Sequence, residues 1–352
     1  MKKPTRREFL GKTIVGAIGA GAALSGIDAL SLFGQRPARP QMAGTQQITA
    51  DRRAFTAGRY AVLLDGAVAG WVQSVEGGHA AADVASGAAS LQRKHIAGVK
   101  YEDITVSCGA GMSKPFYEWI KASMDRQNAR KSGSIVYLDN DSNVQSTLEF
   151  ANGLITEVSF PALDAASKDA ARMTIKISPE TTRMVEKSGA RLPGAPAQRA
   201  AAQKQKQWLP ANFRLKIAGL DCTRVNKIEA ITIKQKVVEN PVGEMRAAQK
   251  EPAKLEIPNL VISMPEQNAA ALAAWHKESV VNGRTANNRK DGQLEYLMPD
   301  GRESLFTLAF HNLGIFKLTP DKMEAGSENI RRVKAELYCE EIHFSYGDSA
   351  WA

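Results

Sequence analysis

The hydrophobic and polar positions follow one order of elements twice along the chain. In the first half, short apolar or alternating stretches predict strands, whereas one stretch has apolar residues about 3.6 positions apart and predicts a helix. The helix is expected over 116–124, where Phe116, Trp119, Ile120 and Ala122 share a face. The strands are expected over 59–65, 101–107, 134–138, 147–150, 154–160 and 172–177.

The second half repeats this order, with strands expected over 213–219, 253–263, 293–297 and 310–315 and a helix over 270–278. Its landmark residues follow those of the first half at a slowly growing offset. Trp275 lies 156 residues after Trp119, Tyr296 lies 159 after Tyr137, and Phe310 lies 160 after Phe150. Small loop insertions produce such a one-directional drift, so the order indicates an internal duplication.

The expected fold class is mainly β with one helix per module (α+β), arranged as two tandem β-barrel or sandwich domains. Module 1 is assigned to 55–185 and module 2 to 209–347. A Lys-, Gly-, Pro-, Ala- and Gln-rich linker over 186–208 joins them, and a Pro/Gln/Gly-rich linker over 35–54 precedes them.

The joint order of these motifs resembles a known family. An early strand ends at a Gly turn, a Trp-containing helix follows the next strand, and a Tyr-Leu hairpin strand precedes a Phe-x-Asn-x-x-Ile strand, at Phe150–Ile155 and again at Phe310–Ile315. Together they look like the tail tube proteins of contractile phages. The module also resembles the inner-tube subunits of contractile injection systems and the haemolysin-coregulated protein of type VI secretion.

The resemblance implies a small β-barrel or rolled sandwich flanked by one helix, assembling as six-subunit rings that stack into a hollow tube. It also implies that the Ala/Gly/Ser-rich stretch 66–98 includes an extended hairpin that overlaps a neighbouring subunit; a flexible surface loop is the alternative. Phage tube subunits are normally single modules without export signals, and the present chain departs from them on both points.

The N-terminal residues 1–34 read as a twin-arginine signal peptide. Arg6 and Arg7 precede Phe9 and Leu10, and a weakly apolar, Gly-rich run follows. Such signals are read by a receptor and are not anchors. We therefore expect the twin-arginine translocase as a partner, an exported protein in the periplasm or outside the cell, and no stable membrane anchor. The alternative is an uncleaved membrane helix over 13–33, which its glycines and one aspartate disfavour.

The composition of the 352 residues, 43% hydrophobic and 24% charged, excludes wholesale disorder, collagen and coiled coil. Of the net charge of +9, residues 1–34 contribute five basic against two acidic side chains. The remaining excess is a mild bias, so no nucleic-acid partner is expected.

No motif predicts catalytic, cofactor-binding or metal-binding residues. The five histidines lack ligand spacing, and the three widely spaced cysteines form no CxxC pair. The acidic turn at 139–142 lacks the Gly and Glu of a calcium loop and is interpreted as a hairpin turn.

The tryptophans could form a carbohydrate platform, but core positions are favoured. The expected structural core residues are Trp119, Trp275, Tyr137, Tyr296, Phe150 and Phe310. We expect the two tryptophans to lie in separate cores, one per module.

The favoured function is an exported structural protein that self-assembles into rings or a tube, with three chains per pseudo-hexameric ring. Two alternatives remain at this stage: a twin-arginine-exported enzyme with a bound cofactor, and a monomeric periplasmic binding module.

Overall fold

The computed structural model describes residues 58–86, 94–186, 189–192, 208–240, 248–284, 288–321 and 330–347. The predicted signal peptide, the linker over 35–54 and most of the linker over 186–208 therefore lie outside the described residues. None of the helices in the described ranges is long and apolar enough to cross a membrane.

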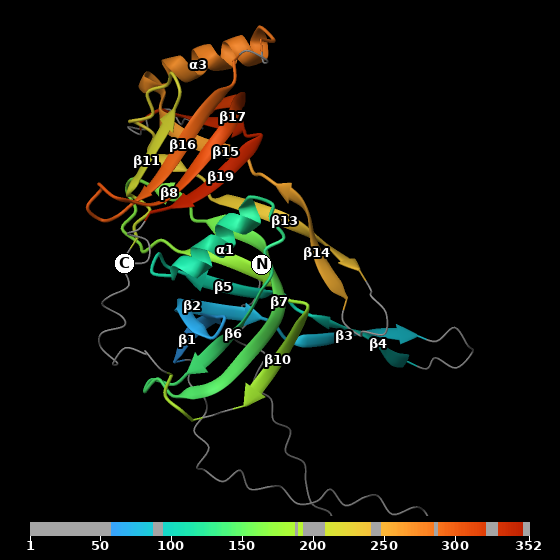
Figure 1. Cartoon of the computed structure of the whole chain (residues 1–352). Helices are drawn as coiled ribbons and strands as arrows, with labels where there is room; N and C mark the ends of the chain where they lie inside the picture. Colours follow the sequence, from blue (N-terminus) through green and yellow to red (C-terminus); the bar gives the residue numbers. More distant parts are fainter. Residues whose placement is uncertain are drawn as a thin grey trace, which may run out of the picture. The chain divides into compact units, whose positions relative to one another are not determined.

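Module 1 is a strand-rich unit with one helix (Figure 1). Its elements are β1 (Arg59–Leu64), β2 (Ala67–Gly77), β3 (Ala80–Ser86), β4 (Lys94–Tyr101), β5 (Ile104–Cys108), α1 (Lys114–Met124), β6 (Lys131–Leu138), β7 (Val144–Phe160), β8 (Leu163–Asp164), β9 (Met173–Ser178) and β10 (Thr181–Glu186). The strand order β7-β6-β1-β2-β5-β9 returns to β7, because β9 also pairs with β7. The sheet thus closes into a barrel, and closure removes its free edges.

Module 2 follows with a similar succession of elements. These are β11 (Phe213–Ile217), β12 (Lys227–Ile228), β13 (Ile231–Asn240), β14 (Gln249–Glu256), β15 (Leu260–Pro265), the turn η1 (Glu266–Asn268), α3 (Ala270–His276) with its π-helical continuation η2 (Lys277–Val281), β16 (Lys290–Leu297), β17 (Ser304–Pro320), β18 (Arg332–Tyr338) and β19 (Glu341–Tyr346). Its sheet has the order β11-β16-β17-β18-β15-β12, with β19 on β17. The predicted mainly-β fold with duplicated, barrel-like modules is confirmed.

Two predicted strand boundaries were wrong. The expected strands 147–150 and 154–160 are one strand, β7, in which Asn152 takes a left-handed φ of 50° and lets the strand continue through a bend. The expected strand 253–263 is two strands, β14 and β15, separated around Pro258, which has no N–H to donate to a sheet.

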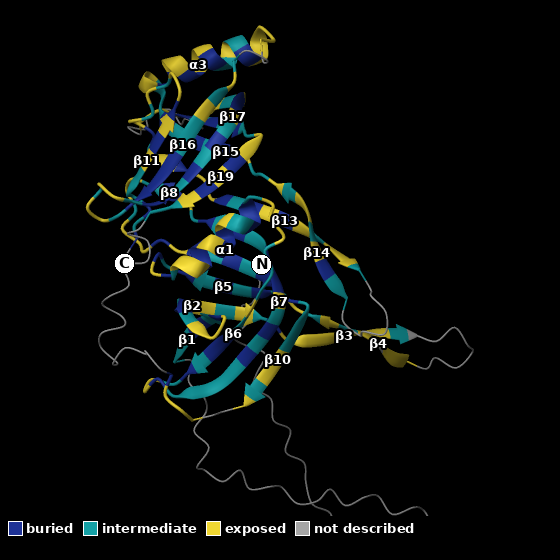
Figure 2. Cartoon of the chain, viewed as in Figure 1, coloured by how far each residue is buried: buried dark blue, intermediate teal, exposed yellow. Residues whose placement is uncertain are grey.

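The core is continuous through both modules, so the expectation of separate cores was wrong. One cluster of buried side chains contains Trp119 and Trp275 together. Figure 2 shows that buried residues occur in the strands of both modules. The reason is that aromatic residues of both modules, such as Phe160 and Phe344, pack against one another where the modules meet.

Candidate assembly interface

The β13–β14 hairpin of module 2 adds strands to the sheet of module 1. β13 pairs antiparallel with the end of β7, from Ile231 opposite Phe160 to Lys234 opposite Glu157. The Lys234 ammonium lies 3.7 Å from the Glu157 carboxylate. The next strand of module 1, β8, pairs in return with β12 of module 2. Each module therefore extends the sheet of the other.

Lys250 of β14 anchors this hairpin through polar contacts on module 1. Its ammonium donates to Ser178 Oγ at 2.9 Å, and its backbone N–H donates to a Glu180 carboxylate oxygen at 3.1 Å. The Arg130 guanidinium donates to the Lys250 carbonyl at 2.7 Å and lies 4.0 Å from Glu180. The Lys250 side chain is only 9% exposed, so these contacts replace the water that the ammonium loses.

A cluster of aromatic side chains packs in the same interface. Tyr117 of α1 stacks on Tyr346 of β19, with ring centroids 5.6 Å apart. Phe160 of β7 lies 5.5 Å from Tyr296 and 5.8 Å from Phe344. Burial raises the pKa of Tyr296, because the phenolate would lose its hydration. Interfaces of this apolar composition resemble a domain core cut in half.

Trp208, at the end of the predicted linker, belongs to this cluster. Its ring lies 5.4 Å from Tyr296 and 5.3 Å from Phe306. Its carbonyl accepts the backbone N–H of Ala171 at 2.7 Å, which ties the linker's end to module 1. Trp208 is 1% exposed and offers no platform to a ligand.

The predicted core residues lie at matched positions in the two modules. Trp119 is fully buried and donates its indole N–H to the Ala129 carbonyl at 2.8 Å; Trp275 donates to the Asn288 carbonyl at 2.7 Å. Phe150 stacks on Trp119, and both Phe150 and Phe310 are buried.

The paired tyrosines differ. Tyr296 is fully buried, whereas Tyr137 is half-buried and meets Tyr60 edge to face at 5.4 Å. The predicted signal residues Arg6, Arg7, Phe9 and Leu10 lie outside the described residues.

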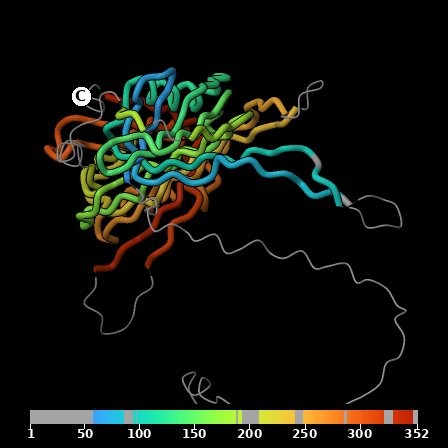
Figure 3. The backbone as a smooth tube through the Cα atoms, turned by 90° about the horizontal axis from the view of Figure 1, so that it is seen from below, coloured from blue at the N-terminus to red at the C-terminus, as the bar shows by residue number. Residues whose placement is uncertain are grey.

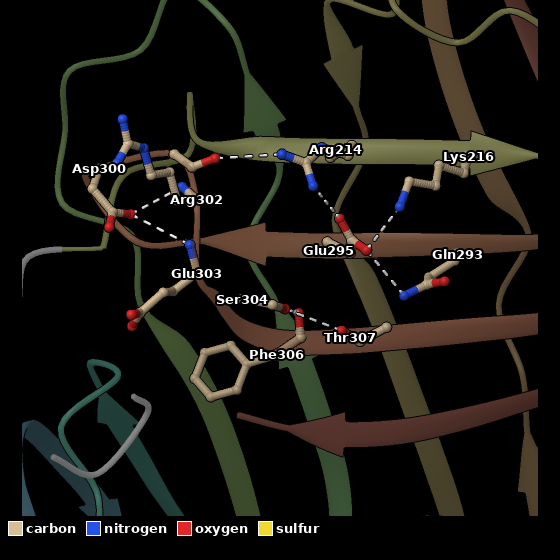
Figure 4. A network of polar contacts seen from close by, with 11 residues as sticks. Arg214, Lys216, Gln293, Glu295, Asp300, Arg302, Glu303, Ser304, Phe306 and Thr307 are labelled. Atoms are coloured by element: carbon tan, nitrogen blue, oxygen red, sulfur yellow. Dashed lines mark hydrogen bonds and ion pairs between the residues drawn. The ribbon is translucent and has the colours of Figure 1, made fainter. Parts of the chain in front are cut away.

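Module 2 carries a charged network around Glu295 on β11, β16 and β17 (Figure 4). Glu295 of β16 accepts from Arg214 at 3.0 Å, from Lys216 at 3.1 Å and from Gln293 at 3.1 Å. The matching position in module 1 is Val136, which packs in a small apolar cluster with Ala61, Leu138 and Leu192. The two modules have thus diverged on their outer faces while they keep the same barrel positions.

Within the described ranges, no group of His, Cys, Asp or Glu side chains is placed to hold a metal ion. Asp139 forms the predicted hairpin turn, because its carboxylate accepts the backbone N–H groups of Asp141 and Asn143. The three cysteines are free thiols, and burial raises the pKa of Cys108 to about 12.

An open cavity of about 610 Å³ is lined by residues of β6, β7 and β10 and by the turn at Asp65 and Gly66. The charged pair that lines it, Arg183 and Glu149, is exposed, with the Arg183 guanidinium 2.7 Å from the carboxylate.

Reasoning from the sequence missed the docking of β13–β14 on module 1. A signal was present, because Ile231, Ile233 and Gln235 alternate with Thr232 and Lys234 as in a half-buried strand. All three are buried in the structure, although β13 lies outside the barrel of its own module.

The comparisons with known proteins agree with this architecture. The family model described as T4-like virus tail tube protein gp19 matches residues 56–183 and again 209–343. No curated protein matches the sequence.

Solved structures give partial matches. The sheath/tube terminator of an extracellular contractile injection system matches at 20% identity, over 38% of this chain and 99% of that chain, with a TM-score of 0.34. A chain of the anti-feeding prophage baseplate matches at 13% identity, over 38% and 91%, with a TM-score of 0.32. Hcp1 from Flavobacterium johnsoniae matches at 16% identity, over 38% and 95%, with a TM-score of 0.24.

Because the family model covers most of both modules, the chain belongs to the T4-like virus tail tube protein gp19 family, with two tail-tube-like modules in one polypeptide.

Proposed function

We propose that the protein is an exported structural subunit that self-assembles into rings or a hollow tube. The observation that carries this proposal is the interface inside the chain, where a hairpin of module 2 extends the sheet of module 1. A module built in this way is a repeating unit: the same contact, made again between chains, continues the assembly. Its mechanism is architectural, and no residue acts as a catalyst.

Three chains per ring follow from the duplication. A family ring of six modules needs three chains of two modules each, with true three-fold and pseudo-six-fold symmetry. Module–module contacts would then alternate between contacts within a chain and contacts between chains. Cyclic closure of head-to-tail contacts also prevents open-ended growth within the plane of the ring.

Export by the twin-arginine route suits such a subunit. That pathway carries proteins that have already folded, and the continuous core with its free cysteines requires no oxidising compartment to form. The protein would therefore reach the periplasm or the cell exterior as a folded two-module unit.

Negative-stain electron microscopy of the protein lacking residues 1–34, at tens of micromolar, tests this function. We expect rings or stacked rings with a central hole. A strictly monomeric protein without rings on the grid would contradict ring and tube together, and would favour a binding module.

A further inference from the structure

The β3–β4 hairpin of module 1 has the same pairing register as the docked β13–β14 hairpin. Ala81 pairs with Lys100 and Val84 with Ile96; at the matching places Lys234 pairs with Glu256 and Val237 with Pro252. Each hairpin has a register shift between these two pairs. The cross-strand ion pair is conserved with its charges exchanged: Asp83–Lys100 at 2.7 Å in one hairpin, Lys236–Glu256 at 2.8 Å in the other.

The two hairpins differ in what covers them. β3 and β4 form a two-stranded sheet that projects from module 1 and pairs with no other described strand (Figures 1 and 3). Lys250 is 7% exposed, whereas its counterpart Lys94 is exposed. Val84 and Ile96 are 65% and 70% exposed. Exposed apolar side chains on an unpaired hairpin are typical of a surface that binds a partner.

Module 2 carries an uncovered copy of the surface on which β13–β14 docks. β7 and β17 both have 17 residues. The end of β7 pairs with β9 on one side and β13 on the other, whereas the end of β17 pairs with β18 and, in the described part of the chain, with no second strand.

The uncovered surface is apolar and bulkier than its covered copy. Met124 beneath β13–β14 is 3% exposed, whereas its counterpart Val280 is 46% exposed. Thr156 of β7 is replaced in β17 by Phe316, which is 39% exposed.

The sizes of the two partners compensate. Where β13 presents Ile233 and Gln235 to module 1, β3 has Ala80 and Ala82. Smaller side chains on the β3–β4 hairpin would therefore meet larger side chains on the uncovered surface of module 2, which we call the receiving surface. A close-packed interface requires such compensation.

The polar contacts that hold Lys250 on module 1 also have counterparts in module 2. Arg289 lies 2.5 Å from Glu340 in module 2, at the positions that Arg130 and Glu180 occupy in module 1. Arg130 and Glu180 hold Lys250. The residue of β4 that matches Lys250 is Lys94, so Glu340 would accept from Lys94.

Charge makes the arrangement selective. Lys234 of β13 lies opposite Glu157 in module 1. In module 2 the position of Glu157 is Lys317, which would repel Lys234. β3 has the uncharged Ala81 at the position of Lys234, followed by Asp83, so it meets no like charge at Lys317. The β13–β14 hairpin thus suits module 1 better than module 2, whereas the β3–β4 hairpin meets no charge repulsion on module 2.

We propose that the β3–β4 hairpin docks on module 2 of a second copy of this chain, across the end of β17, in the register Ala81 opposite Lys317. Lys94 would be buried and Val84 and Ile96 half-buried against that copy, as Lys250, Val237 and Pro252 are in the docked hairpin. The occupant is a second copy because the chain itself provides the template for the contact. The inference rests on the proposed self-assembly and adds to it the interface between chains.

A disulfide crosslink tests the register. Opposed residues of antiparallel strands have Cα atoms about 4.5–5.5 Å apart, within the range of a disulfide. In a Cys222→Ser, Cys339→Ser background, Ala81→Cys with Lys317→Cys should give covalent ladders of chains on mild oxidation. The matched control, Ala81→Cys with Lys334→Cys, places the second thiol on β18 and should not. Equal crosslinking in both would overturn the register.

Complementary variants test the docking itself. Ile96→Asp on the hairpin and Phe316→Asp on the receiving surface change exposed residues, so each chain should fold, as circular dichroism can check. Burying an unpaired carboxylate should weaken self-association about tenfold or more in each variant. Because each chain keeps one intact surface, a mixture of the two should form one-to-one dimers and no rings. The control Val238→Asp alters an exposed residue of the other hairpin and should assemble normally.

The outcomes separate the two proposals. Wild-type protein that never self-associates would overturn the proposed function. Wild-type protein that forms rings while both variants also form them would overturn only the docking of β3–β4 on module 2.

Discussion

At the residue scale, the two modules keep the same hydrogen bonds and backbone conformations at matched positions. The indole N–H of each helix tryptophan donates to a backbone carbonyl beyond its helix. Asn152 and Asn312 both have left-handed backbones, with φ of 50° and 56°. Their backbone N–H groups donate to side chains of the preceding strand, Ser132 and Asp291. Asparagine tolerates this conformation better than most residues, so both positions keep it.

Trp119→Ala and Trp275→Ala should each destabilise the protein by roughly 3–5 kcal/mol, because each empties a buried aromatic site. Since the core is continuous, both substitutions should lower one cooperative unfolding transition. Denaturant melts followed by circular dichroism measure this. A loss below about 1 kcal/mol for both variants would mean that the tryptophans are exposed. Two separate transitions would restore the expectation of independent cores.

At the element scale, the spacing of apolar residues was sufficient to predict strands and helices of the barrels. It was not sufficient to predict the docking of the β13–β14 hairpin, which lies outside the barrel of its own module. The helices and the Tyr-Leu strands could be predicted because their apolar spacing reflects burial within their own module. β13 could not be placed, because the surface that buries Ile231 and Ile233 belongs to residues about 70 positions earlier in the chain. A strand that is buried by a distant partner shows the same alternation of apolar and polar residues as a strand that is buried within its own module.

The hairpin turn between β6 and β7 should contribute stability that depends on pH. Hydrogen bonds from Asn143 and its neighbours lower the pKa of Asp139 below that of an unfolded aspartate. Its contribution is therefore complete above about pH 4 and is lost as the pH falls through the lowered pKa. Asp139→Asn should be less stable than the wild type at neutral pH, and the difference should shrink in acid. Urea melts from pH 7 down to about 2 measure it; a difference independent of pH would contradict the role of the carboxylate.

At the scale of the whole molecule, export should depend on the guanidinium pair of the signal. Replacing Arg6 and Arg7 together with Lys keeps the charge and removes the planar, forked donors, and the two side chains are not equivalent in recognition. We expect the precursor to remain in the cytoplasm. Fractionation of cells that produce either form measures this, with a Lys2→Arg, Lys3→Arg variant as the control for altered basic residues nearby. Unchanged export of the double variant would rule out a twin-arginine signal.

The stoichiometry of the assembly follows from the two kinds of contact. Within a chain, module 2 reaches module 1 through β13–β14, with the Lys234–Glu157 pair at one end of the β13–β7 pairing. Between chains, β3–β4 would reach module 2, where Lys317 excludes the other hairpin. The contacts must then alternate around a ring, which permits only whole chains and an even number of modules.

If each contact turns the next module by about one sixth of a circle, as a six-module family ring implies, closure comes at three chains. Native mass spectrometry of the protein lacking residues 1–34 should therefore show trimers and multiples of three. Dimers or tetramers as the dominant closed species would mean that the two contacts differ in rotation, and that the duplication no longer follows the six-fold geometry.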